Sequence, residues 1–207
     1  VFEDTFSHKE GVSPTYQKVN GFAPIFCYAG REGFMVANEL RPGSQHSGNG
    51  AVEFLKRCIA IMLQAGYEAR ELLVRVDSGH DSSDFIEALS ELGVKYLVKR
   101  NPRKESLEQL LDSIRYDETP EQVRPGKVIY RGVRSDRSPA DFPGYSGFMV
   151  VEAIERTVLA DGQALLIPSI ELSSWWTNLP YSVRQCAALY RDHGTSEQFH
   201  RELQLSL

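Results

Sequence analysis

The order of helices and strands before residue 100 most constrains the fold of this chain. Apolar residues at helical spacing predict a helix over Ala51–Ala65, and the short, partly β-branched run Glu71–Asp77 predicts a buried strand. The capping sequence Asp81–Asp84 begins a second helix, and Val94–Arg100 predicts the next strand. Strands that alternate with helices in this way are joined by right-handed crossovers, so we expect an α/β fold with a partly parallel sheet.

The segment before this pattern predicts a hairpin. Ala23–Tyr28 and Phe34–Leu40 are strand candidates, and the turn sequence Gly30–Gly33 separates them. Residues 1–20 are polar and contain glycine and proline, so we expect a loop there.

The segment after residue 103 has a different character. A helix is predicted over Lys104–Tyr116, and a final helix begins near Tyr181 and reaches Gln204. Further strands are predicted between these helices at Lys127–Val133, Phe148–Thr157, Ala164–Ile170 and Leu172–Thr177. We therefore divide the chain into a first core segment (1–103), a β-rich insertion (104–170), and a last core strand with its helix (171–207).

The composition excludes some classes of protein. The 23 Lys and Arg residues against 28 Asp and Glu residues give a formal charge of −5, which argues against a uniformly basic surface for coating nucleic acid. A local basic groove remains compatible with this charge. The chain contains no long apolar run and no signal-peptide pattern. Its 3 cysteines are widely spaced within apolar segments, which indicates reduced thiols of an intracellular protein.

Two carboxylates are candidates for chemistry. Asp77 ends a predicted strand and precedes Ser-Gly, so it is either a turn-capping acid or a metal ligand or base at the sheet edge where α/β proteins bind ligands. Glu197 lies on a polar face of the last helix, which is either a solvated surface or one wall of a wet cleft. The members of this face are Tyr190, His193, Glu197, His200, Arg201 and Gln204. Carboxylates of this kind suit Mg²⁺ or Mn²⁺.

Basic and aromatic residues lie near the same expected edge. The cluster Lys99, Arg100, Arg103 and Lys104 is either solvated surface or a contact for a phosphate backbone. The pair Trp175–Trp176 is more typical of a core than of a base-stacking platform. The chain has no zinc-ligand spacing, no phosphate-binding glycine loop and no serine-hydrolase elbow.

Four stretches together resemble the catalytic domain of DDE transposases from bacterial insertion sequences. They are Lys9–Gly11 with Thr15–Tyr16 and Gly21–Pro24; Glu39–Gly43 with His46; Leu73–Gly79; and Trp176–Leu179 followed by Tyr190–Gln204. The family signature on the last helix is Tyr, two residues, Arg, three residues, Glu, six residues, Lys. Tyr190 and Glu197 match it, whereas His193 and Gln204 replace the two basic residues.

The resemblance implies a ribonuclease-H-like mixed sheet flanked by helices, with a β-rich insertion before the catalytic helix. It implies that Asp77 and Glu197, with a third Asp, hold two Mg²⁺ or Mn²⁺ ions for DNA strand cleavage and strand transfer at the ends of a mobile element. We expect the third acid just upstream of Val1, with Asp4 as a weaker candidate. The implied DNA-binding residues are Tyr190, His193, Gln204, Lys99, Arg100 and Arg103. The implied partners are double-stranded DNA and a second copy, in the bacterial cytoplasm at the nucleoid.

Two other functions remain open. The chain could be an inactive transposase remnant that only binds DNA or a protein, which the replacements at His193 and Gln204 and the net charge of −5 favour. It could also be a stand-alone metal-dependent nuclease.

Overall fold

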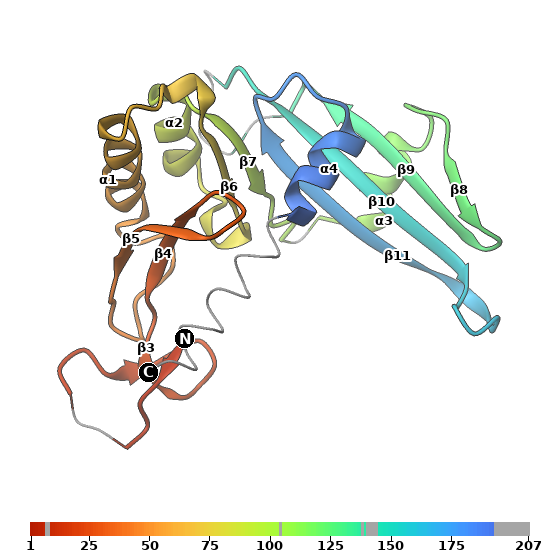
Figure 1. The fold of residues 1–207 in the computed structure, drawn as a ribbon. Helices are drawn as coiled ribbons and strands as arrows, with labels where there is room; N and C mark the ends of the chain where they lie inside the picture. Colours follow the sequence, from red (N-terminus) through yellow and green to blue (C-terminus); the bar gives the residue numbers. More distant parts are fainter. Residues whose placement is uncertain (7–8, 104, 138, 140–144, 193–207) are drawn as a thin grey trace. The chain divides into compact units, whose positions relative to one another are not determined.

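The computed structural model describes the chain except residues 7–8, 104, 138, 140–144 and 193–207. The described residues form two compact units. The first contains Val1–Glu71 and Asp192, and the second contains Leu72–Arg191 (Figure 1). None of the described helices is long and apolar enough to cross a membrane.

The first unit combines a small sheet, a hairpin and one long helix. Its strands are β1 (Phe2–Glu3), β2 (Ser13–Pro14), β3 (Asn20–Phe22), β4 (Ile25–Ala29) and β5 (Phe34–Glu39), followed by α1 (Ala51–Gln64) and a short 3₁₀ helix (Ala69–Glu71). The predicted hairpin (β4–β5) and helix are confirmed. The loop predicted over residues 1–20 is wrong in part, because β1 and β2 pair with β3. Strands of two residues carry no readable alternation, so only their long-range pairing reveals them.

Arg41 joins the hairpin to the start of α1. Its side chain is 3% exposed, and its Nε donates to Glu39 Oε1 at 2.8 Å. The same guanidinium donates to the carbonyls of Ser47 and Gly50 at 3.4 and 3.3 Å, and it lies 5.9 Å from the ring centroid of Phe54. A buried charge needs such partners, so Arg41 fixes the polar loop between β5 and α1.

Gly43 lies where two other backbone segments approach closely. A Cβ atom at this position would collide with the carbonyl oxygens of Ser13 and Gly21. Only glycine allows this approach, so the glycine of the Glu39–Gly43 stretch has a structural role.

Two of the cysteines are adjacent in the fold although they are far apart in sequence. The thiol of Cys27 on β4 lies near that of Cys58 on α1. This proximity and burial raise the pKa of Cys58 above its usual value. All three cysteines are free thiols, as the sequence predicted.

The second unit is built on a mixed sheet in the order β6-β7-β11-β10-β9-β8 (Figure 1). Its strands are β6 (Leu73–Val76), β7 (Lys95–Lys99), β8 (Glu121–Arg124), β9 (Lys127–Arg134), β10 (Phe148–Val158) and β11 (Ala164–Thr177). Its helices are a 3₁₀ turn (Ser78–His80), α2 (Ser83–Glu91), α3 (Leu107–Ile114) and α4 (Val183–Arg191). β6 and β7 are parallel, as predicted, and the other neighbours are antiparallel.

One long strand replaces two predicted ones. β11 runs without a break from Ala164 to Thr177 and pairs with β10 along its length. The sequence predicted a break at Glu171, a charged residue between apolar neighbours. Glu171 pairs with Arg156 on β10 at 2.6 Å, so its charge is satisfied within the strand pair. β8 was not predicted at all.

Helices cover both faces of this sheet. On one face, Leu97, Val150 and Trp175 form a core with α4 residues Val183, Cys186 and Ala187. On the other face lies α3, because a Cβ at Gly132 would meet Ile114 of that helix. Gly132 pairs with Val151, whose side chain alternates in direction with that of Val150.

Side chains at the end of β11 attach it to β7. Trp176 is buried, as the core interpretation predicted, and its Nε1 donates to Asp81 Oδ1 at 2.9 Å. Thr177 Oγ1 donates to the Tyr96 carbonyl at 2.7 Å. Asn178 accepts from the Tyr96 amide at 3.0 Å and donates to the Val94 carbonyl at 3.0 Å. Asn178 thus satisfies one backbone group just before β7 and one within it.

We predict that Gly43→Ala destabilises the first unit by about 1–3 kcal/mol or more, because the added methyl group meets backbone that cannot move aside. The matched control is Gly48→Ala, whose Cβ would meet only the His46 ring, at 3.4 Å. Urea unfolding of both variants measures the difference. Equal midpoints for the two variants would contradict the prediction.

We also predict that Trp176→Phe destabilises the chain more than Trp175→Phe does, by about 1–3 kcal/mol, because it leaves the Asp81 carboxylate without its indole donor. Both rings are buried in the same strand, but Trp175 Nε1 has no hydrogen-bond partner among the described residues. Thermal unfolding of the two variants tests this. A larger loss for Trp175→Phe would show that the hydrogen bond is unimportant.

Candidate functional site

Asp77 directly follows the carboxyl end of β6. Its Oδ1 accepts from the Gly79 amide at 3.0 Å, so it caps the 3₁₀ turn Ser78–His80. The Nδ1 atom of His80 lies 3.1 Å from the same oxygen, and the His80 ring packs 5.1 Å from that of Phe85. The Asp77 side chain is nevertheless 69% exposed. It is therefore both a turn-capping acid and a fixed, accessible carboxylate, so the capping role does not exclude a metal-binding one.

Tyr190 and Lys99, two of the predicted DNA-binding residues, lie together. Tyr190 is in the last turn of α4, and its ring centroid is 5.5 Å from that of Trp175 on β11. The Lys99 Nζ atom lies 5.8 Å from the Tyr190 ring centroid. The contact places a positive charge and a phenol at the carboxyl end of β7, on the sheet face that α4 covers.

Arg100 and Arg103, two other members of the basic cluster, have different surroundings. Arg100 makes an ion pair of 2.6 Å with Glu105, and its guanidinium lies 5.6 Å from the Trp176 ring centroid. Burial raises the pKa of Glu105, but the hydrogen bonds and charges of Arg100 and Arg137 together outweigh it and hold the pKa below its usual value. Arg103 is exposed and donates to the Asp81 carbonyl at 3.2 Å. The basic cluster is thus divided between the two faces of the sheet.

The other predicted site residues lie outside the described residues. They are Glu197, His193 and Gln204, together with His200 and Arg201. Within the described part of the chain, no group of three or more His, Cys, Asp or Glu residues could hold a metal ion. Asp77 offers carboxylate oxygen, the ligand type that Mg²⁺ and Mn²⁺ prefer, so the described donor fits one ligand of such a site.

Three consecutive residues at the end of α4, Leu189–Arg191, contact the sheet. The sequence analysis did not predict these contacts. Arg75 on β6 donates from Nη1 to the Leu189 carbonyl at 2.7 Å. Arg191 donates to Glu152 Oε1 at 3.1 Å, and Glu152 also accepts from Arg131 Nε at 2.8 Å. The sequence signal for this anchoring was Arg75 itself, a charged residue within the predicted buried strand, two positions before Asp77.

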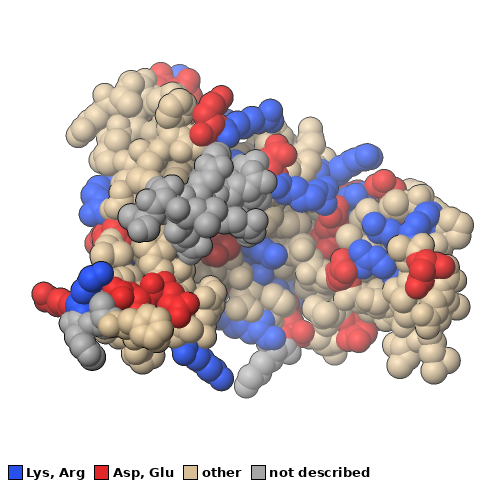
Figure 2. Space-filling view, turned by 60° about the horizontal axis from the view of Figure 1, so that its bottom comes forward, with Lys and Arg blue, Asp and Glu red and all other residues tan. Residues whose placement is uncertain are grey.

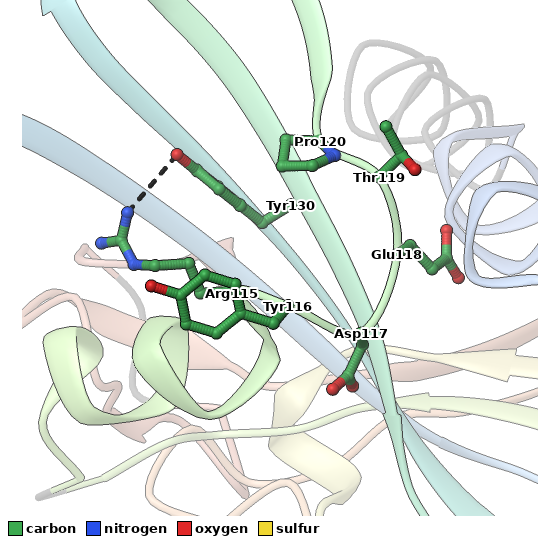
Figure 3. A pocket seen from close by; sticks show the side chains of 7 residues that line it. All are labelled: Arg115, Tyr116, Asp117, Glu118, Thr119, Pro120 and Tyr130. Carbon is green, nitrogen blue, oxygen red and sulfur yellow. Dashed lines mark hydrogen bonds between the residues drawn. The ribbon is translucent and has the colours of Figure 1, made fainter.

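A surface pocket of the second unit lies elsewhere. Its volume is about 620 Å³, and Figure 3 shows the residues that line it: Arg115, Tyr116, Asp117, Glu118, Thr119, Pro120 and Tyr130. Arg115 donates to the Tyr130 hydroxyl at 3.4 Å, and Tyr130 donates to Glu155 at 3.0 Å. None of the predicted site residues that the structure describes lines this pocket, so it is not the candidate site.

Charges of both signs are interspersed on the surface. On the face shown in Figure 2, Lys and Arg atoms lie between Asp and Glu atoms, without one continuous basic face. This distribution agrees with the formal charge of −5. Any contact with DNA on this face is therefore local.

Comparison with known proteins places the chain in a family. A family model described as transposase DDE domain group 1 matches residues 1–207. No curated protein matches the chain. The match extends over the four stretches that carry the resemblance to DDE transposases, so that resemblance is confirmed at the level of the family. The chain belongs to the transposase DDE domain group 1 family.

Proposed function

We propose that this chain is the catalytic domain of a transposase, which cleaves DNA strands and transfers their 3′ ends at the termini of a mobile element. The observation that carries the proposal is Asp77, an exposed carboxylate at the carboxyl end of a parallel strand in a DDE-family chain. This is the sheet edge at which α/β proteins bind their ligands.

Asp77 and Glu197, with a third aspartate, are the proposed ligands of two Mg²⁺ or Mn²⁺ ions. Such ions, when bound, stabilise the attacking and the leaving oxygen of an in-line displacement at phosphorus. The chain itself orients the Asp77 carboxylate, since the Gly79 amide and the His80 ring hold one of its oxygens. Outer partners of this kind fix a ligand for metal binding.

Double-stranded DNA is the proposed substrate, bound through Lys99, Tyr190 and Arg103 and through His193 and Gln204. Lys99 supports this role best, because its ammonium group lies beside Tyr190 at the carboxyl end of β7. Arg100 contributes less, because Glu105 already neutralises its charge. The proposal includes a ribonuclease-H-like fold, a dimer on DNA, and a place at the bacterial nucleoid.

The first test is Mn²⁺ binding, measured by calorimetry on the chain extended upstream to include the expected third acid. We predict that Asp77→Asn weakens Mn²⁺ binding at least about tenfold, because it removes a charged oxygen ligand. The matched control, Asp84→Asn in the first turn of α2, leaves the affinity unchanged. If neither the extended wild type nor the control binds Mn²⁺, the chain is a remnant without a metal site.

The second test concerns DNA. We predict that Lys99→Gln weakens binding to duplex DNA and lowers the slope of log K against log salt by about 0.9, the value expected for one lost phosphate contact. The control is Lys95→Gln, an exposed lysine at the opposite end of β7. Fluorescence anisotropy over a salt series measures both slopes. Equal slopes for the two variants would remove Lys99 from the DNA-binding surface.

A further inference from the structure

The last turn of α4 is attached to four neighbouring strands through three consecutive residues. Leu189 is attached to β6 through Arg75, and Arg191 is attached to β10 through Glu152. Tyr190, between them, contacts Lys99 on β7 and Trp175 on β11. The first turns of α4 place Val183, Cys186 and Ala187 in the apolar core of the sheet, whereas the hydrogen bonds to the sheet described above lie where the described helix ends.

Among the residues that attach the end of α4 to the sheet, Arg75 is the closest in sequence to Asp77, the proposed metal ligand. In the parallel register Arg75 is paired with Leu97, whose side chain lies in the core beneath α4. Arg75 therefore projects toward α4, and its Nη1 reaches the Leu189 carbonyl at 2.7 Å. A cation is also favoured at this place, because the carbonyl end of a helix carries partial negative charge.

We propose that Arg75 is a positioning residue for the metal site. It joins the strand that carries Asp77 to the last turn of α4, and so fixes the end of β6 from which the Asp77 carboxylate projects. The role in metal binding rests on the proposed function above, whereas the attachment of β6 to α4 does not. Arginine suits the task better than lysine, because its planar fork holds several donors in a rigid arrangement.

The attachment is tested in metal-free protein by hydrogen exchange. We expect Arg75→Gln to accelerate amide exchange at Leu189–Arg191 at least about tenfold, while exchange at Cys186 and Ala187, whose amides lie inside the helix, stays slow. The matched control is Arg156→Gln, which removes another partly buried arginine of the same sheet from its pair with Glu171. Unchanged exchange in Arg75→Gln, or equal acceleration in both variants, would overturn the attachment.

The positioning role is tested by Mn²⁺ calorimetry on the same variants in the extended chain. We expect about tenfold weaker binding in Arg75→Gln, intermediate binding in Arg75→Lys, and wild-type binding in Arg156→Gln. Melting temperatures identify any variant that fails to fold, and Arg75→Lys then serves as the test variant. Faster exchange with unchanged Mn²⁺ affinity would overturn the positioning role. If the wild type binds no Mn²⁺, the proposed function fails, but the exchange experiment still decides the attachment.

Discussion

The second unit depends on the short junction between β7 and β11. Only Trp175, Trp176 and Thr177 pair with β7, although β11 continues far beyond them along β10. Three ladder positions are a weak connection between the parallel pair β6–β7 and the antiparallel strands β8–β10. The side-chain bonds from Trp176 to Asp81 and from Asn178 to the Val94–Tyr96 backbone compensate, because each satisfies polar groups that would otherwise be buried unpaired.

The stretches that resemble DDE transposases therefore combine two kinds of residue. Arg41, Gly43, Trp176 and Asn178 serve the structure, since they fill buried positions, permit close backbone approach or bind backbone groups. Asp77 differs from them, because its carboxylate is fixed by the 3₁₀ turn and is still largely exposed. The stretches therefore contain buried residues that hold the structure and one exposed acid whose direction is fixed.

Most of the positive charge near the sheet has a structural use. Several arginines of the second unit are paired with carboxylates, namely Arg100, Arg115, Arg131, Arg134, Arg156 and Arg191. The number of arginines in the sequence is therefore larger than the number whose positive charge is available to a phosphate backbone. Lys99 differs from these arginines, because its ammonium group lies over the Tyr190 ring. One of these pairs, Arg191 with Glu152, also attaches the end of α4 to β10.

The sequence by itself determined the local elements and the placement of Asp77. The hairpin, α1, and the parallel pair β6–β7 follow from periodicity and capping residues, which act over a few neighbouring positions. Tertiary structure decided the short strands β1 and β2, the unbroken β11, and the contact of Arg75 with Leu189. These features depend on partners far away in the chain, as with Arg75, whose guanidinium donates to the carbonyl of Leu189, 114 positions later.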